Sequence, residues 1–415
     1  MAELRARRLE VALRNHPKAT GVLGDLRQTW PELVRVAKSR GAERPDLLCA
    51  CPPCQGMSTA KSDRGLASNP DEGSRDPRNL LVLPIAEVVR ALSPRVVVLE
   101  NVTAFFRRLV RHPQTGRGVT AAALLIEMLE PFYIFYPIAV DLADFGVPQT
   151  RRRAFLTFVH LEERGLASFR SGGKIPYPEP LAGKADWRCK TLEEALKENG
   201  LPPLDAKSLI GARDPERALH CVPVWDERRY HMIESIPPRS GRSAWENNLC
   251  ISCGPVDAGP DDAECALCRQ PLLRPVIRDS AGTWRLIKGH RRSSYRRMYP
   301  DRPAATVTTA SGKIGSDFTL HPWENRVLSP LECAIIQTFP ADFQWVKETG
   351  IDSIREMIGE AVPPLFTELH GGVLAALLRG RLCGKAMMAT DFRQKRAVAR
   401  LREAASMHED LGASV

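Results

Sequence analysis

An alternation of helical and buried-strand patterns near the start of the chain constrains the fold more than any other feature. Apolar strands are expected at 46–51 and at 95–101, and residues 79–92 between them carry helical periodicity. Strands that alternate with helices are joined by crossovers and run parallel, which predicts a doubly wound α/β sheet. Ligands of such sheets bind beyond the carboxyl ends of the strands, where Cys54 and Glu100 both fall.

The composition is typical of a soluble globular protein with an excess of positive charge. The chain has 415 residues, enough for two or three domains, and 43% of them are hydrophobic and 26% charged. Its net charge of +10 favours a polyanionic partner such as nucleic acid. The longest apolar run, 131–140, is too short to cross a bilayer, and the charged N-terminus is not a signal peptide. We therefore expect a cytoplasmic protein whose 11 cysteines stay reduced.

Cys54 is a candidate nucleophile. It follows the first strand in Cys51-Pro-Pro-Cys54-Gln-Gly-Met-Ser58, where two prolines restrict the backbone before a long polar loop at 57–79. A cysteine held at such a junction acts as a thiolate when a neighbour lowers its pKa or protonates its target. The alternative is a small buried core residue, a role that suits Cys49 and Cys51 better because they lie inside the strand.

A change in composition divides the chain. Residues 1–161 carry the α/β pattern, whereas 162–320 are rich in Pro, Gly, Trp and Arg with little periodicity, which indicates an inserted second domain. Helical patterns return over 321–383, and we expect this segment to rejoin the first domain. Residues 384–415 form a charged tail that we expect to be helical and frayed.

Four cysteines in the inserted domain have the spacing of a metal site. Two Cys-x2-Cys pairs are separated by eleven residues, and they comprise Cys250, Cys253, Cys265 and Cys268. Two tight knuckles of this kind suit a structural zinc ion held by four thiolates, with no open coordination position. A pair of disulfides is the alternative, which a reducing compartment disfavours.

The densest positive charge surrounds this cluster. Residues 271–302 contain nine Lys or Arg against two Asp, with Trp284, Tyr295 and Tyr299 interleaved. Basic residues with interleaved aromatic residues are typical of a surface that contacts phosphates and reads a few bases. The segment therefore predicts an interface with double-stranded DNA. A solvated basic face is the alternative.

Six segments, taken in order, resemble the motifs of the DNA (cytosine-5) methyltransferases. They are Pro52-Pro-Cys-Gln-Gly56, Glu100-Asn-Val102, Gly146-Val-Pro-Gln-Thr-Arg-Arg-Arg153, Arg302-Pro-Ala-Ala-Thr-Val307, the run from Arg326 to Pro340, and Gly359-Glu-Ala-Val-Pro-Pro364. The resemblance implies a Rossmann-like methyltransferase sheet with an inserted target-recognition domain, here one that contains zinc.

The resemblance also implies a mechanism. Cys54 would add to carbon 6 of a flipped-out cytosine and so activate carbon 5, while Glu100 would hold the ring at N3 and at the exocyclic amine. Arg151 and Arg153 would anchor the base or its flanking phosphate and support the catalytic loop. The methyl donor would be S-adenosylmethionine.

Donor-binding positions follow from the same motifs. The resemblance places Asp25, Leu26, Pro52, Glu360 and Val362 beside the donor, and Glu360 stands where the family usually has Asn. Members of the family open with a strand, a Gly-rich turn and a second strand that ends in an acidic residue. This chain shows no counterpart of these elements, because residues 1–20 are expected to form the helix that follows them.

Three explanations fit this departure. The start lies upstream, a companion polypeptide supplies the missing elements, or the chain binds DNA without methylating it. The leading hypothesis is a DNA cytosine-5 methyltransferase, and the runner-up is a subunit of a split enzyme. A zinc-ribbon protein without chemistry would leave Cys54, Glu100 and Arg151 unexplained.

Overall fold

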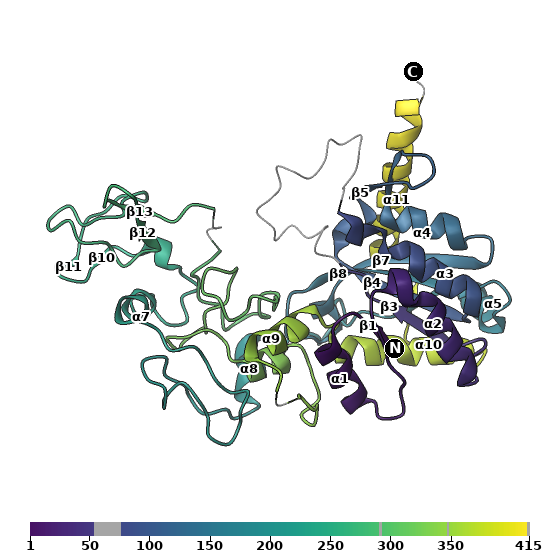
Figure 1. The fold of residues 1–415 in the computed structure, drawn as a ribbon, viewed down its shortest axis with the longest axis horizontal. Coiled ribbons are helices and arrows are strands. Elements are labelled where there is room, and N and C mark those ends of the chain that lie inside the picture. The colour runs from purple at the N-terminus through teal and green to yellow at the C-terminus, as the bar shows by residue number, and fades with distance from the viewer. Residues whose placement is uncertain (54–75, 290–292, 347, 413–415) are drawn as a thin grey trace. The chain divides into compact units, whose positions relative to one another are not determined.

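The computed structural model describes residues 1–53, 76–289, 293–346 and 348–412, with side chains up to Arg402 (Figure 1). The chain forms two compact units. The first unit comprises 1–145, 152–185 and 366–415, and the second comprises 146–151 and 186–365. These boundaries differ from the expected 161 and 320, because α5 (Arg164–Ser171) and β9 (Lys174–Pro178) still belong to the first unit, while α8 (Pro330–Ile336) and α9 (Ile351–Glu360) belong to the second. Cys54 and most of the loop expected at 57–79 lie outside the described residues.

The first unit is built on a four-stranded sheet with the order β3-β4-β8-β7. These strands are β3 (Leu47–Ala50), β4 (Val96–Asn101), β8 (Arg152–His160) and β7 (Tyr133–Asp141). β3 and β4 are parallel, as expected, but β8 runs antiparallel to both of its neighbours. Only residues 142–151 join β7 to β8, fewer than a parallel crossover needs, so the two strands pair antiparallel.

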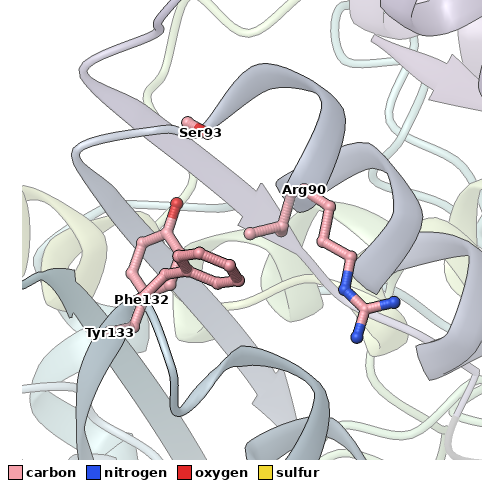
Figure 2. A pocket seen from close by; sticks show the side chains of 5 residues that line it. Arg90, Ser93, Phe132 and Tyr133 are labelled. Atoms are coloured by element: carbon pink, nitrogen blue, oxygen red, sulfur yellow. The ribbon is translucent and has the colours of Figure 1, made fainter.

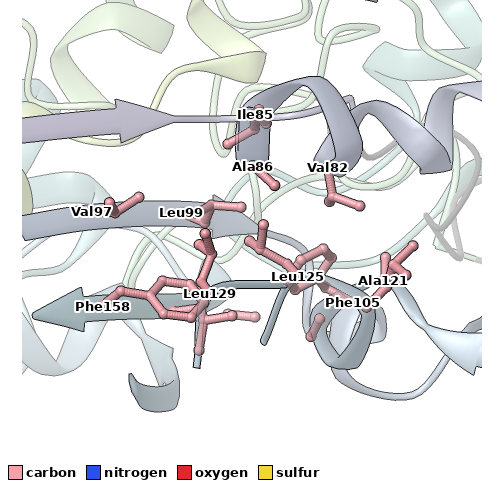
Figure 3. Close-up of a cluster of buried hydrophobic side chains, with 14 of the residues drawn as sticks. Val82, Ile85, Ala86, Val97, Leu99, Phe105, Ala121, Leu125, Leu129 and Phe158 are labelled. Atoms are coloured by element: carbon pink, nitrogen blue, oxygen red, sulfur yellow. The ribbon is translucent and has the colours of Figure 1, made fainter. Parts of the chain in front are cut away.

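Helices cover the sheet and create the main core of the first unit. Side chains of α3 (Val82–Leu92) and α4 (Ala121–Leu129) meet those of β4 and β8, among them Ile85, Leu125, Val97 and Phe158 (Figure 3). All six residues of β4 are buried, which fixes the strand whose end carries Glu100. This unit also contains η2 (Pro77–Leu81), η3 (Thr103–Phe106), β5 (Leu109–Arg111), β6 (Gly118–Thr120), η4 (Leu142–Phe145), α5 (Arg164–Ser171) and α10 (Pro364–Leu378).

The N-terminal segment contains one strand that the sequence did not predict. The expected helix is present as α1 (Ala6–Asn15), and α2 (Leu26–Ser39) follows β2 (Val22–Leu23). Before α1, however, β1 (Ala2–Glu3) pairs parallel with β2 and ends in an acidic residue. The expectation that no strand with a terminal acid precedes α1 was therefore wrong, because two residues are too few to produce a recognisable alternation.

The C-terminal segment is part of the first unit. β14 (Ala386–Met388) pairs antiparallel with β9 (Lys174–Pro178), and α11 (Phe392–Gly412) packs on β7. Ala397 is fully buried in the main core, and Arg393 donates to Asp144 Oδ2. The tail is helical, as expected, but its first turns are packed.

The second unit has short elements and long irregular connections, as its composition predicts. Its elements are α6 (Leu192–Lys197), α7 (Glu227–Glu234), η5 (Ala244–Glu246), β10 (Leu249–Cys250), β11 (Gly254–Pro255), β12 (Val276–Arg278), β13 (Trp284–Leu286), α8 (Pro330–Ile336) and α9 (Ile351–Glu360). Buried arginines join these pieces. Arg297 is fully buried and donates to the backbone carbonyls of Ile233, Ile236, His321 and Glu324.

One apolar helical stretch, 351–378, is long enough to cross a membrane by length and composition alone. It consists of α9, with 10 residues, and α10, with 15, separated at 361–363. Each helix is shorter than the roughly 20 residues that a span requires. Both also bury side chains within the protein, including Ile358 and Phe366.

The packing of α11 yields a test of its role. Ala397→Glu places a charge in the main core without a partner, so we expect it to lower the free energy of unfolding by about 3 kcal/mol or more. Ala399→Glu is the matched control, because Ala399 is exposed on the same helix. Thermal denaturation of the two variants measures the difference. Equal melting temperatures would contradict the packing described here.

Candidate active site and cysteine cluster

Glu100 and Arg153 form an ion pair at the carboxyl end of β4. Arg153 Nε lies 2.8 Å from Glu100 Oε1, and the two side chains are only 13% and 11% exposed. The pair follows from strand register: Glu100 lies opposite Phe155, so Arg153, two residues earlier on β8, is on the same face. The salt bridge fixes the orientation of a carboxylate that stays within reach of a ligand at the strand end.

Asn101 joins the ends of β3 and β4. Its Nδ2 donates to the carbonyl of Pro52 at 3.1 Å, and its Oδ1 accepts from the backbone N–H of Val102 at 2.8 Å. Pro52 is thereby held beside the end of β4, two residues before Cys54. Asn101 belongs to the motif Glu100-Asn-Val102, but the sequence analysis predicts no function for it. Its position at the end of an apolar strand could have indicated one.

Cys49 and Cys51 are exposed, so the expectation that they are buried core residues was wrong. β3 is an edge strand of the described sheet and carries exposed residues in alternation. An edge strand is covered less completely than a central one, which explains why strand position alone did not imply burial.

Arg151 is fully buried within the second unit and donates to backbone carbonyls. Its Nη1 donates to Val307 at 3.0 Å, and its Nη2 donates to Gly359 at 2.8 Å and to Ala361 at 3.0 Å. These bonds are those of a residue that holds the backbone in place. The described geometry thus brings Glu100 together with Arg153 and gives Arg151 separate partners.

Gln149 and Gln337 extend this buried network. Gln149 Nε2 donates to Gln337 Oε1 at 3.0 Å, while Gln149 Oε1 accepts from the backbone N–H of Val307 at 2.9 Å. Gln337 Nε2 donates in turn to the carbonyl of Ile358. Sequence reasoning missed both glutamines as functional residues, since a polar side chain in a motif gives no sign of burial.

Gly359 lies where the backbone of α9 meets the chain at Thr308. A Cβ atom at this position would lie 2.4 Å from the carbonyl carbon of Thr308 and 2.5 Å from the nitrogen of Thr309. Only glycine permits this approach. The next residues expected to contact the donor, Glu360 and Val362, are both partly buried beside this contact in the second unit.

Asp25 and Leu26 lie in the first unit at the start of α2. Asp25 caps the helix by accepting from the backbone N–H of Arg27 at 2.9 Å, and it pairs with the Arg27 side chain. These bonds lower the pKa of Asp25, so its carboxylate is ionised at neutral pH. Leu26 packs against the main core. Glu3 ends β1, the strand parallel to β2, and sequence reasoning missed it as an acceptor at this edge.

The four spaced cysteines come together in the second unit. The sulfur atoms of Cys250, Cys253, Cys265 and Cys268 all lie within 4.8 Å of one another. A zinc ion bound at about 2.3 Å by four sulfurs would place them about 3.8 Å apart. Cys250 and Cys265 are buried with Leu272 in a small core of their own. The spacing thus predicted a cluster of suitable size for a tetrahedral metal ion.

Backbone and sulfur contacts set the ionisation of this cluster. Backbone N–H groups of Cys268 and Leu267 lower the pKa of Cys265 to about 7, because they stabilise its thiolate. The neighbouring thiol of Cys268 raises the pKa of Cys253 to about 12. Four adjacent sulfurs therefore cannot all be thiolates near neutral pH unless a cation compensates their charge, and a zinc ion fits this requirement.

A pocket of about 420 Å³ is lined by Arg90, Ser93, Phe132 and Tyr133 among others (Figure 2). Residues from the end of α3 and the start of β7 line it, and the Tyr133 hydroxyl donates to the carbonyl of Pro94 at 2.8 Å. β4 begins just after Pro94, so this pocket lies at its amino end. Ligands of parallel sheets bind at the carboxyl end instead.

The first unit is thus an α/β domain that carries polar residues at the carboxyl ends of its central strands. A family model of the C-5 cytosine-specific DNA methylases matches residues 10–372, and the chain belongs to this family. The resemblance noted in the sequence is thereby confirmed, and the chain is a DNA cytosine-5 methyltransferase by family.

Individual relatives agree with this assignment. The type II methyltransferase M1.HgaI of Avibacterium volantium is 26% identical over 377 residues, covering 88% of each chain. M.DdeI of Desulfomicrobium norvegicum is 26% identical over 369 residues, covering 85% of this chain and 77% of its own. A crystal structure described as a DNA modification methyltransferase encoded within an E. coli prophage covers 91% of this chain and 92% of its own, with a TM-score of 0.51 and 20% identity. It shares the fold.

The contact at Gly359 yields a second test. Gly359→Ala forces a methyl group against the backbone at Thr308, and we expect a loss of about 1–3 kcal/mol in the free energy of unfolding. Gly371→Ala is the control, because a Cβ there meets nothing within 4 Å in the middle of α10. The free energy of unfolding of Gly371→Ala should rise by about 0.5–1 kcal/mol. A Gly359→Ala protein as stable as the wild type in urea denaturation would refute this close approach.

Proposed function

We propose that this protein transfers a methyl group from S-adenosylmethionine to carbon 5 of cytosine in double-stranded DNA through a covalent Cys54 adduct. The membership of the family is the observation that carries this proposal. The described neighbours of Cys54 support it, because Asn101 ties Pro52 to the end of β4, beside Glu100.

Glu100 and Arg153 would act on the cytosine ring. A base stacked in a duplex is out of reach, so the cytosine must first be flipped out. Addition of the Cys54 thiolate to carbon 6 places negative charge on the ring at N3. Glu100, in its protonated form, would stabilise this charge by donating its proton to N3, and it would accept a hydrogen bond from the exocyclic amine. Arg153 would hold Glu100 in the required orientation through the 2.8 Å contact. Carbon 5 would then take the methyl group, which leaves the donor as a neutral thioether. A base would remove the carbon-5 proton, and the electrons of that C–H bond would re-form the C5–C6 double bond and expel the Cys54 thiolate.

S-adenosylmethionine would supply an electrophilic methyl group on its sulfonium. The residues at the carboxyl edge fit such a donor, since the ionised carboxylate of Asp25 can still accept hydrogen bonds from an adenine amine beyond those from Arg27. Glu3 ends the neighbouring strand and offers an acceptor for ribose hydroxyls. We propose that Leu26 and Pro52 contact the donor as well, and we keep Glu360 and Val362 as donor contacts on the family motif alone. Arg151 would position the backbone that carries Glu360.

The second unit would recognise the DNA target. We propose that it is the target-recognition domain and that the four cysteines hold a structural zinc ion. The relatives named above are type II methyltransferases, which supports a role in restriction-modification. Dependence on a companion polypeptide gains no support from these comparisons.

Methyl transfer itself provides the first test. The full chain with labelled S-adenosylmethionine and duplex DNA should incorporate label, and Cys54→Ser should abolish incorporation because the hydroxyl is a far weaker nucleophile. Glu100→Gln should lower kcat by about 10²- to 10⁴-fold, since it removes the carboxylate. Sites are mapped by bisulfite sequencing.

Two controls make the result specific. Cys51→Ser changes an exposed cysteine three residues away and should retain activity. Wild-type protein should form a stable adduct with duplex DNA carrying 5-fluorocytosine, whereas Cys54→Ser should not. Methylation that survives the serine substitution would refute the covalent mechanism.

Metal content tests the cysteine cluster. One zinc ion per chain should co-purify, and binding should release protons because the thiols must ionise. Cys250→Ala combined with Cys253→Ala should remove the metal, while Cys221→Ala, outside the cluster, should not. Elemental analysis and a pH indicator measure both effects. A folded wild type that neither contains nor takes up zinc would exclude the site.

A further inference from the structure

The β12–β13 hairpin has one face turned inward and one turned outward. Its register pairs Ile277 with Arg285 and Arg278 with Trp284, and directly opposed residues share a face. On the face of Trp284, Val276 is buried, Trp284 is partly buried and Arg278, next to the turn, is exposed. On the other face Ile277 is 37% exposed and Arg285 is exposed. Ile277 and Arg285 therefore form an outward face on this two-stranded ribbon.

The inward face is fixed to the cysteine cluster. Glu264, the residue before Cys265, accepts the backbone N–H of Trp284 on its Oε1 at 3.0 Å. The Arg228 guanidinium lies 5.7 Å from the centre of the Trp284 ring, and its Nη2 donates to the carbonyl of Leu272 at 3.2 Å. The hairpin is thus positioned by groups that belong to the cluster or contact it.

The cluster is anchored in turn by a buried arginine. Arg274 is fully buried and donates to the carbonyls of Asn247, Gly259 and Asp262 at 2.6–2.8 Å. Asn247 donates to the carbonyl of Met232 on α7 at 3.0 Å. The hairpin therefore rests on a connected support that continues into the larger core of the second unit.

The outward face carries unneutralised positive charge. Arg285 is exposed, and the described residues provide its side chain with no hydrogen-bond or ion-pair partner. Lys288, which follows the end of β13, is exposed as well. The one carboxylate of the hairpin, Asp279, accepts the turn N–H groups of Ala281 and Thr283. An arginine beside an apolar residue on a rigid ribbon has the chemistry needed to read a guanine edge and to contact a thymine methyl group.

We propose that the β12–β13 hairpin enters the major groove of DNA and that Arg285 determines part of the target sequence. The major groove admits a two-stranded ribbon, and an arginine that contacts guanine discriminates against other bases. Glu264 is a positioning residue, because it holds the strand that carries Arg285. This inference deepens the proposed function, on which it rests for its DNA substrate.

Selection from a random-sequence duplex library tests the inference by binding alone. Full-length wild type should enrich one motif. Arg285→Ala should lose the preference at one base pair, with affinity for the wild-type motif falling about 5- to 100-fold and affinity for unrelated duplexes changing far less. Arg213→Ala removes an exposed arginine elsewhere in the same unit and should keep the motif.

Glu264 is tested in the same selection. Glu264→Ala should retain the metal and weaken the sequence preference at the base pair that Arg285 reads. Glu264→Gln keeps an oxygen acceptor and should preserve this preference. An unchanged preference in Glu264→Ala would overturn the positioning role.

Three outcomes would overturn the role of Arg285: no motif with the wild type, an identical motif and affinity with Arg285→Ala, or an equal loss on every sequence, which signals a phosphate contact only. A wild type that enriches a motif but transfers no methyl group would refute the proposed function while leaving this inference intact.

Discussion

A carboxylate at the end of the most buried strand must be paired, and the rest of the first unit follows from that constraint. Removing a partner from a buried ion pair costs about 3–5 kcal/mol, so Glu100 requires Arg153 or an equivalent cation. Arg153 can supply the charge only because β8 runs antiparallel to β4 in a register that places both side chains on one face. The direction of β8, a departure from the expected parallel sheet, is thus part of how the site is built.

Buried arginines perform a different task in the second unit. Arg151, Arg274 and Arg297 are all fully buried, and each donates to several backbone carbonyls of irregular segments or of the last turn of a helix. Burial lowers the pKa of Arg297 to about 10, which still leaves it charged at neutral pH. A planar group with five donors can satisfy carbonyls that no helix or strand satisfies. This explains how a unit with so few regular elements holds a defined structure.

Long apolar helices and strands and the cysteine cluster could be predicted from the sequence, whereas the contacts of individual side chains could not. β4 and α3 were predicted because apolar runs between polar ends leave a clear pattern, and the cysteine cluster because four ligands at fixed spacing have few other uses. β1 was missed because two residues have no period. Arg151 and Arg153 look alike in sequence, yet Arg151 binds backbone carbonyls and Arg153 binds the carboxylate of Glu100. Only tertiary contacts distinguish a buried arginine from a solvated one. Cys54 lies outside the described residues, so its assignment still rests on its motif.

The cysteine cluster also explains why a hairpin so small can be rigid. The core of the cysteine cluster contains three buried residues, of which two are cysteines and one is Leu272. Burying a leucine side chain contributes about 1.5–3 kcal/mol, far less than the conformational entropy that some thirty ordered residues lose. A structural zinc ion contributes about 10–16 kcal/mol of apparent binding free energy in small domains. The apolar contacts of this region are therefore too few to order it alone, and the metal ion proposed for the four sulfurs would add to the support that Arg228 and Arg274 give.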